Sequence, residues 1–280
     1  MNTMALYDHV CAEASSAVVR RYSTSFSIGV RALAPRLRPP IKAIYGFVRF
    51  ADEIVDTFHG KDKARLLARF REDAYGAIRD GISMNPVLHS FQACANTYGI
   101  GPELIEPFLE SMAMDLDCKE HDPASFNRYI MGSAEVVGLM CLRVFCEGDE
   151  AAYQRLKPAA VRLGAAFQKV NFLRDIRDDL GALGRNYFPQ VKAGRFDEQM
   201  KREVERDLEA DFEAALAGIR ELPTGARLGV YISYVYYRTL FQRIQGLSAA
   251  RVMQERIRLG NPRKMGLLAT CCIKHHIGWI

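Results

Sequence analysis

The stretch IKAIYGFVRFADEIVDTF, from Ile41 to Phe58, decides the fold, because it is apolar almost all the way round and yet contains a charged stripe. A helix with this pattern is typical of the interior of a helical bundle. Asp52 and Asp56 are one turn apart on one helix face, and Arg49 lies three residues earlier on the same stripe. Two carboxylates on a buried face repel each other unless a cation compensates them. A divalent ion would do so.

A second stretch, QKVNFLRDIRDDL from Gln168 to Leu180, repeats the arrangement. Its polar stripe recurs at spacings of three, four and four residues and consists of Gln168, Asn171, Asp175 and Asp179. All four offer oxygen atoms, which Mg²⁺ or Mn²⁺ prefers, whereas zinc calls for Cys or His. One such pair is more often a solvated or salt-bridged face. Because there are two pairs, each with an arginine nearby (Arg49, Arg174), we expect a site that clamps metals around a diphosphate.

The rest of the chain has helical periodicity nearly everywhere, so we predict an all-α protein. No repeat, low-complexity tract or linker marks a second domain, and residues 1–280 are expected to form one helical bundle. The predicted helices are residues 5–22, 39–58, 62–80, 86–97, 102–118, 124–147, 150–182, 197–220, 224–246 and 249–275, the last with a break near Gly260 and Pro262.

Composition excludes several classes of protein. The 280 residues are 49% hydrophobic and 25% charged, which excludes a disordered or collagen-like chain. The net charge is +5, and the basic residues are not concentrated in one stripe, so no nucleic-acid partner is expected. Seven cysteines without framework spacing are expected to be reduced and mostly buried. The longest apolar stretch, Tyr129 to Cys146, contains Glu135 and Arg143, so we expect no transmembrane span and a cytoplasmic location.

A series of short motifs extends along nearly the whole chain. They are Tyr22-Ser23-Thr24-Ser25-Phe26, Ala43-Ile44-Tyr45 through Arg49 to Asp52-Glu53-Ile54-Val55-Asp56, Met114-Asp115-Leu116, Tyr129, Ala134 to Val137-Gly138-Leu139-Met140, Asn171-Phe172-Leu173-Arg174-Asp175-Ile176-Arg177-Asp178-Asp179 and Gly184-Arg185-Asn186-Tyr187-Phe188-Pro189. With these motifs the sequence resembles the squalene/phytoene synthase family nearly end to end. Weaker matches are Tyr237 and the stretch from Arg256 to Lys264. The resemblance implies the all-α isoprenoid-synthase (class I terpenoid synthase) fold, with a central cavity between the two Asp-rich helices.

The resemblance also implies an enzyme, a Mg²⁺-dependent (or Mn²⁺-dependent) prenyltransferase that joins two prenyl diphosphates head to head through a cyclopropyl diphosphate. On the matching positions, the metal ligands would be Asp52, Asp56, Asn171, Asp175 and Asp179. The diphosphates would be contacted by Ser25, Tyr45, Arg49, Gln168, Arg174, Tyr237 and Arg256. Tyr45 and Tyr129 are candidates for cavity-facing groups that assist proton loss or stabilise a cation; the alternative for each is packing in the core.

Three positions depart from the family pattern. Tyr22 replaces a histidine that many relatives carry, which puts a diphosphate contact there in doubt. Glu53 replaces a second Asp, and because it points off the stripe we expect little effect. Glu135 places a charge where relatives have Gly, and it could face a polar partner such as Arg143.

The product is open between C40 phytoene from two C20 donors and C30 dehydrosqualene or squalene from two C15 donors, and NADPH is expected only for squalene. The run LRPPIKAIYGFVRFADEIVD, the NYFP ending and the small Val30 favour a bacterial type of phytoene synthase, and thus carotenoid biosynthesis. A class I terpene cyclase fits the motifs poorly. An inactive scaffold protein is disfavoured because all the acidic positions are intact.

The C-terminal part leaves two further hypotheses. Cys272 and His276 are one turn apart, but this is no recognised zinc pattern, and we expect an ordinary helix end. The basic, partly apolar stretch from Arg263 to Ile280 could form a peripheral contact with the inner face of the membrane. The sequence leaves the oligomeric state open.

Overall fold

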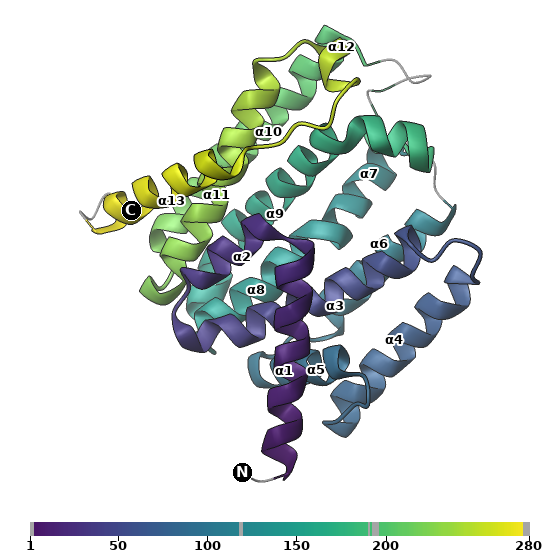
Figure 1. Cartoon of the computed structure of the whole chain (residues 1–280), viewed down its shortest axis with the longest axis vertical. Helices are drawn as coiled ribbons and strands as arrows, with labels where there is room; N and C mark the ends of the chain where they lie inside the picture. The colour runs from purple at the N-terminus through teal and green to yellow at the C-terminus, as the bar shows by residue number, and fades with distance from the viewer. Residues whose placement is uncertain (1–2, 118–119, 190, 192–195, 277–280) are drawn as a thin grey trace.

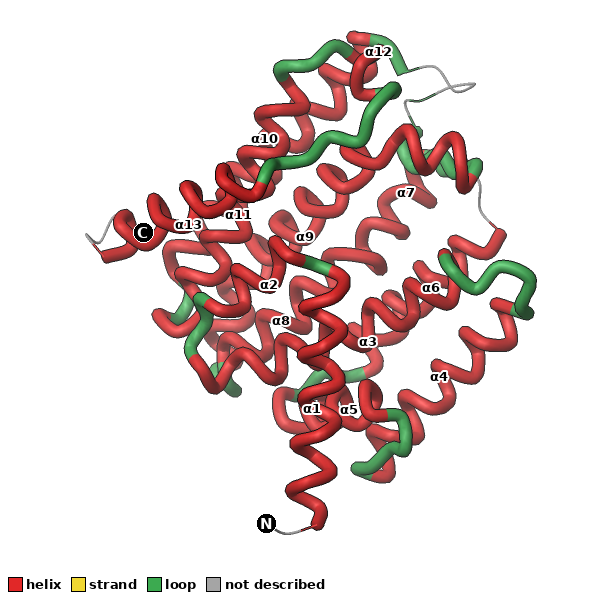
Figure 2. Tube along the Cα trace, viewed as in Figure 1, coloured by secondary structure: helices red, strands yellow, loops and turns green. Residues whose placement is uncertain are grey.

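A computed structural model describes residues 3–117, 120–189, 191 and 196–276 (Figure 1). The α-helices are α1 (Thr3–Tyr22), α2 (Thr24–Arg31), α3 (Arg38–Asp56), α4 (Lys63–Asp80), α5 (Pro86–Tyr98), α6 (Pro102–Asp117), α7 (Pro123–Ile130), α8 (Val136–Cys146), α9 (Glu150–Asp178), α10 (Glu198–Glu221), α11 (Thr224–Gln245), α12 (Ala249–Val252) and α13 (Asn261–His276). A 3₁₀ turn, η1 (Pro35–Leu37), and two π-helical turns, η2 (Met131–Glu135) and η3 (Asp179–Leu183), complete the secondary structure. The described residues contain no strand (Figure 2), which confirms the all-α prediction.

Helix α3 packs its apolar side into the first half of the bundle, against α1, α5 and α6. Phe47 has no exposed surface and stacks on Phe91 of α5, with ring centroids 3.9 Å apart. Burial of such a side chain contributes about 1.5–3 kcal/mol to folding. The apolar pattern of the opening stretch is therefore the packing surface that fixes α3 in the bundle.

Helix α9 organises the second half and packs against α8, α10, α11 and η2. Glycines allow two close crossings there. A Cβ atom on Gly164 of α9 would lie 2.6 Å from the carbonyl oxygen of Ala134, and one on Gly29 of α2 would lie 2.4 Å from Oγ of Ser233 in α11. Larger residues at these glycines would push the helices apart, so the small side chains set the spacing of the bundle.

The predicted helices agree with the structure except at three places. Helix α2 was not predicted, although Ser23 caps it by accepting a hydrogen bond from the backbone N–H of Phe26. The predictions over 124–147 and 150–182 miss the π-helical turns η2 and η3. The helix predicted over 249–275 is wrong between residues 253 and 260, where the chain is not helical. We call residues 253–260 the strap; in it, buried Ile257 and Leu259 alternate with exposed arginines, the pattern of an extended chain.

One described helical stretch, Pro123–Cys146, is long and apolar enough to cross a membrane, and 56% of its most apolar window is buried against the rest of the protein. Core helices share these properties, so the stretch is only weak support for a span. The described cysteines are free, four of them are buried, and Cys272 is exposed. The end of the proposed membrane contact, residues 277–280, lies outside the described residues.

Candidate active site

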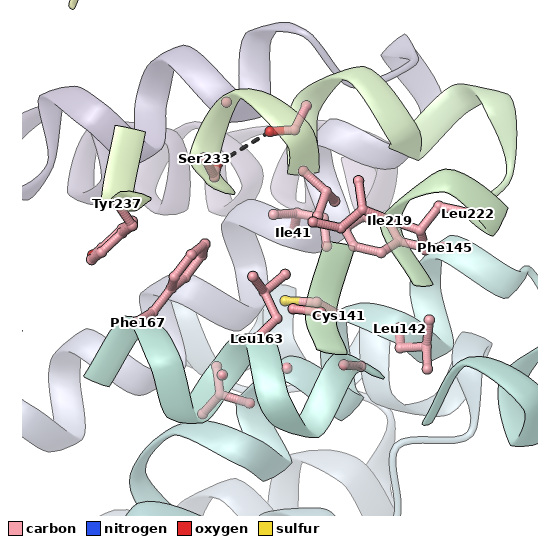
Figure 3. A pocket seen from close by; sticks show the side chains of 18 of the residues that line it. Ile41, Cys141, Leu142, Phe145, Leu163, Phe167, Ile219, Leu222, Ser233 and Tyr237 are labelled. Atoms are coloured by element: carbon pink, nitrogen blue, oxygen red, sulfur yellow. Dashed lines mark hydrogen bonds between the residues drawn. The ribbon is translucent and has the colours of Figure 1, made fainter. Parts of the chain in front are cut away.

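An apolar cavity of about 270 Å³ lies between α2, α8, α9, α10 and α11 (Figure 3). Leu142, Phe145 and Leu222 line one end, and Phe167 and Tyr237 line the other. Glycines at the helix crossings, including Gly29 and Gly164, also line it. Small residues in the walls leave room for an elongated apolar group. Val30, expected to admit a long tail, is among the lining residues.

Polar side chains gather at the Tyr237 end of the cavity. The hydroxyl of Tyr237 donates a hydrogen bond to Oδ1 of Asn171 (3.3 Å), and Nδ2 of Asn171 donates to Oε1 of Gln168 (3.4 Å). Ser25, in the first turn of α2, lines the cavity together with Gln168 and Tyr237. The ring of Tyr237 stacks on Phe167 with centroids 4.0 Å apart. The cavity therefore ends in polar groups that continue along α9 toward its acidic residues.

The first acidic motif lies in the last turns of α3. Nη1 of Arg49 is 2.7 Å from Oδ2 of Asp52, and the same guanidinium also binds Glu53. Burial, together with the charge of Asp56, raises the pKa of Asp52 to about 7. Glu53, at which little effect is expected, binds the same guanidinium as Asp52. Arg49 also lies 4.4 Å above the ring of Tyr22.

The second acidic motif lies at the end of α9. Oδ1 of Asp175 accepts a hydrogen bond from Nε of Arg174 (3.0 Å) and lies 2.6 Å from Nε of Arg256 in the strap. The pKa of Asp179 is raised to about 7, mainly by burial and further by the charges of Asp175 and Asp56. Asp56 belongs to α3, so the two acidic motifs are close enough to repel each other.

Two residues of the site were not assigned a role from the sequence, although both belong to motifs quoted above. Asp115, in α6, accepts hydrogen bonds from the hydroxyls of Tyr129 (2.7 Å) and Tyr187 (3.0 Å). Arg185 follows η3 in the chain. Its Nη1 lies 2.6 Å from Oδ1 of Asp56, and its Nη2 donates a hydrogen bond to the carbonyl oxygen of Asp115 (2.9 Å). In the sequence, the available signal for Asp115 is a single acidic residue between the apolar residues Met114 and Leu116.

The structure bears on three expectations about individual side chains. Neither Tyr45 nor Tyr129 is among the described residues that line the cavity. Tyr45 stacks behind Phe26, with ring centroids 4.8 Å apart, and Tyr129 is 3% exposed and bound to Asp115. Arg143 is not the partner of Glu135, because Arg143 binds Glu150 at the start of α9. The positive charges that favour the ionised form of Glu135, and so lower its pKa, are those of Lys169 and Arg162.

Among the residues that the structure describes, no three side chains of His, Cys, Asp or Glu gather closely enough to hold a metal ion by themselves. Cys272 and His276 therefore belong to no such group. The acidic motifs instead present pairs of carboxylates, each with an arginine beside it.

Comparisons with known proteins agree with this geometry. The model of the squalene/phytoene synthase family matches residues 19–263. The chain is 30% identical to a chloroplastic phytoene synthase of Narcissus pseudonarcissus over 258 residues, which cover 84% of this chain and 58% of that protein. It is 30% identical to a presqualene diphosphate synthase of Rhodopseudomonas palustris over 173 residues, or 59% of this chain and 58% of that protein.

The fold is shared with a solved dehydrosqualene synthase. A crystal structure of a dehydrosqualene synthase in complex with ligand superposes with a TM-score of 0.82 at 18% identity, covering 96% of this chain and 98% of the other. The chain matches about 58% of the length of both curated relatives. Because the family match extends over most of the chain, the chain belongs to the squalene/phytoene synthase family.

Proposed function

We propose that this protein joins two prenyl diphosphates head to head, and that its substrates are two C20 geranylgeranyl diphosphates, which give phytoene. The observation that carries the proposal is the apolar cavity that ends at Gln168 and Tyr237, next to two acidic motifs that repel each other. A prenyl diphosphate has matching parts, an apolar tail and an anionic head. Membership of the family supports the reaction class.

The donor set fits Mg²⁺. Every residue assigned as a ligand offers oxygen: Asp52, Asp56, Asn171, Asp175 and Asp179. Mg²⁺ usually takes one or two carboxylates and completes its shell with water and substrate phosphates, so it needs no three-residue cage made by the protein alone. When bound, Mg²⁺ would act as a Lewis acid toward the departing diphosphate.

Arginines would hold the diphosphate itself. Arg49 binds Asp52, and Arg174 and Arg256 bind Asp175, so each guanidinium already lies at the acidic motifs. A guanidinium matches phosphate oxygens in a bidentate geometry. We infer that a bound diphosphate draws these arginines from the carboxylates and frees carboxylate oxygens for cations.

The cavity would protect the cation that forms when the first diphosphate leaves. Its walls are mainly aliphatic, and such an apolar lining would disfavour water, which would otherwise quench the cation. The ring of Phe26, with Tyr45 stacked behind it, lines this wall, and an aromatic ring there would stabilise a nearby positive charge. Overall, two donors lose two diphosphates and two protons, so phytoene formation needs no reductant.

The alternative within the same reaction class is a C15 donor, giving dehydrosqualene, squalene with NADPH, or presqualene diphosphate. It is favoured by the similarity to a presqualene diphosphate synthase. The C20 and C15 hypotheses are distinguished by incubating the protein and Mg²⁺ with either diphosphate, with and without NADPH. The masses of the products are then measured in the organic and aqueous phases. We expect a C40 hydrocarbon from C20 diphosphate without NADPH. A C30 product as the main outcome would replace phytoene with the alternative, and no coupled product at all would refute both.

A further inference from the structure

A buried network connects the first acidic motif to Tyr129, and Arg185 lies at its centre. Only 10% of the Arg185 side chain is exposed, and its Nη1 lies 2.6 Å from Oδ1 of Asp56. Its Nη2 donates to the carbonyl oxygens of Asp115 (2.9 Å) and Val55 (3.5 Å). One guanidinium therefore ties together the C-terminal ends of α3 and α6.

The second acidic motif is joined to the same residue through the backbone. The N–H of Arg185 donates to the carbonyl oxygen of Asp179 (2.8 Å). Gly184 allows this return of the chain, because its φ of 63° lies in the left-handed region that favours glycine. The position of Arg185 is thus set by the end of the helix that carries the second motif.

Asp115 fixes the guanidinium from the opposite side. Its Oδ1 lies 3.8 Å from Nη1 of Arg185, and it accepts hydrogen bonds from Tyr129 and Tyr187. Asp115 is 7% exposed, and the ring of Tyr187 stacks on Phe172 of α9 with centroids 4.1 Å apart. These contacts leave Arg185 little freedom to move away from Asp56.

We propose that Arg185 is a positioning residue, which holds one oxygen of Asp56 so that the other is presented to a cation in a fixed orientation. The proposal rests on the proposed function, because that function makes Asp56 a cation ligand. Arg185 does not touch the substrate; it acts through Asp56, and Asp115 keeps it in place. Residues that orient a metal ligand in this way are typically worth about 10–100-fold in metal affinity.

The test is the affinity for Mn²⁺ in the presence of inorganic pyrophosphate, measured as free Mn²⁺ by electron paramagnetic resonance on the full chain. Arg185→Gln removes the charged contact with Asp56. Arg185→Lys keeps the positive charge but loses the planar guanidinium and its several donors. Asp115→Asn removes the negative charge that helps to hold Arg185 in place. Arg36→Gln is the control, because Arg36 forms an exposed pair with Glu147 (2.8 Å) beyond the opposite end of α3. Circular dichroism and thermal unfolding show which variants are folded.

Arg185→Gln is expected to weaken Mn²⁺ binding about tenfold or more. Arg185→Lys and Asp115→Asn should weaken it less, and Arg36→Gln should not change it. If Arg185→Gln does not fold, Asp115→Asn and Arg185→Lys carry the test. Unchanged or tighter Mn²⁺ binding in the folded variants would overturn the proposal. This binding assay does not depend on turnover. Weakened Mn²⁺ binding would therefore support the positioning role of Arg185 even if the wild type made no hydrocarbon. Unchanged binding would refute that role alone, even if the wild type made the expected product.

Discussion

Nε of Arg256 lies 2.6 Å from Oδ1 of Asp175, and this ion pair binds the strap to the second acidic motif. Ile257 and Leu259 of the strap are buried, and the carbonyl oxygen of Arg258 accepts a hydrogen bond from Arg243 (2.8 Å), whereas the Arg256 side chain is 40% exposed. The contact thus joins a solvent-accessible arginine to a carboxylate that we assign to cation binding. An arginine in this position can exchange the carboxylate for a diphosphate without rearrangement of the core.

Replacing Arg256 with Gln should weaken binding of inorganic pyrophosphate in the presence of Mg²⁺ by about tenfold or more, since one charge-assisted contact is worth about 1.5–3 kcal/mol. Thermal stability should change little, because an exposed ion pair contributes about 0–1 kcal/mol. Isothermal titration calorimetry and a melting curve measure the two effects. Arg251→Gln is the matched control, because Arg251 precedes the strap and forms a surface pair with Glu255, a strap residue away from the acidic motif (2.8 Å). Equal pyrophosphate affinity in both variants would contradict the role of Arg256.

Asp52→Asn should stabilise the metal-free protein and abolish turnover. Burial and the charge of Asp56 raise the pKa of Asp52 to about 7, so the ionised carboxylate is costly in the folded state near neutral pH. Removing that charge should raise the free energy of unfolding by about 1 kcal/mol, or roughly 2–4 °C in Tm, after allowance for solvent screening. Asp73→Asn is the control, because Asp73 is exposed and pairs with Arg69 (3.8 Å). A destabilised Asp52→Asn protein, or one with full activity, would argue against the account.

Tyr129→Phe and Tyr187→Phe form a matched pair, since both hydroxyls donate to Asp115. Each variant should lose about 1.5–3 kcal/mol of stability, the usual worth of a hydrogen bond to a charged group. If Tyr129 assists proton loss, kcat should fall further in Tyr129→Phe than in Tyr187→Phe at similar KM. Steady-state kinetics and urea unfolding compare them directly. An equal fall in kcat would reduce Tyr129 to a structural residue.

Glu135→Gln should stabilise the protein at high pH and have little effect at low pH. Burial raises the pKa of Glu135 above its ordinary value of 4.5; Lys169 and Arg162 oppose the shift, and Asp211 adds to it. A carboxyl group with a raised folded pKa binds more protons in the folded state, so its contribution to stability is lost as the pH rises from about 4.5 through that pKa. Glutamine cannot lose a proton, so the variant should gain most above neutral pH. Urea unfolding at several pH values checks this, and a gain that is independent of pH would rule out the titration of Glu135 as its cause.

Much of the bundle could be predicted because its helices carry long apolar periodicity and clear breakers. The strap was missed because Pro262 and Gly260 were interpreted as a break within one helix. The alternation of Ile257 and Leu259 with arginines was the available signal for extended chain. Helix α2 is eight residues long, too short for periodicity to distinguish it from a loop.

The site could be predicted where a repeated spacing placed side chains on one face, as at Asp52 and Asp56. Asp115 and Arg185 could not be assigned a role, because the contacts of Arg185 with Asp56 and Asp115, and of Asp115 with Tyr187, join residues 70 or more positions apart and depend on tertiary packing. The same holds for Glu135, whose partner could not be identified from the sequence. Helical spacing determines neighbours within an element, but not which elements meet.

The central claim is that two prenyl diphosphates are joined and both diphosphates are released. The most direct measurement is the ratio of inorganic pyrophosphate released to C40 hydrocarbon formed, from purified protein with Mg²⁺ and C20 diphosphate. The account predicts two pyrophosphates per hydrocarbon, and neither product from Asp56→Asn or Asp175→Asn. Pyrophosphate release without any coupled hydrocarbon, or an unchanged yield from the two aspartate variants, would contradict it.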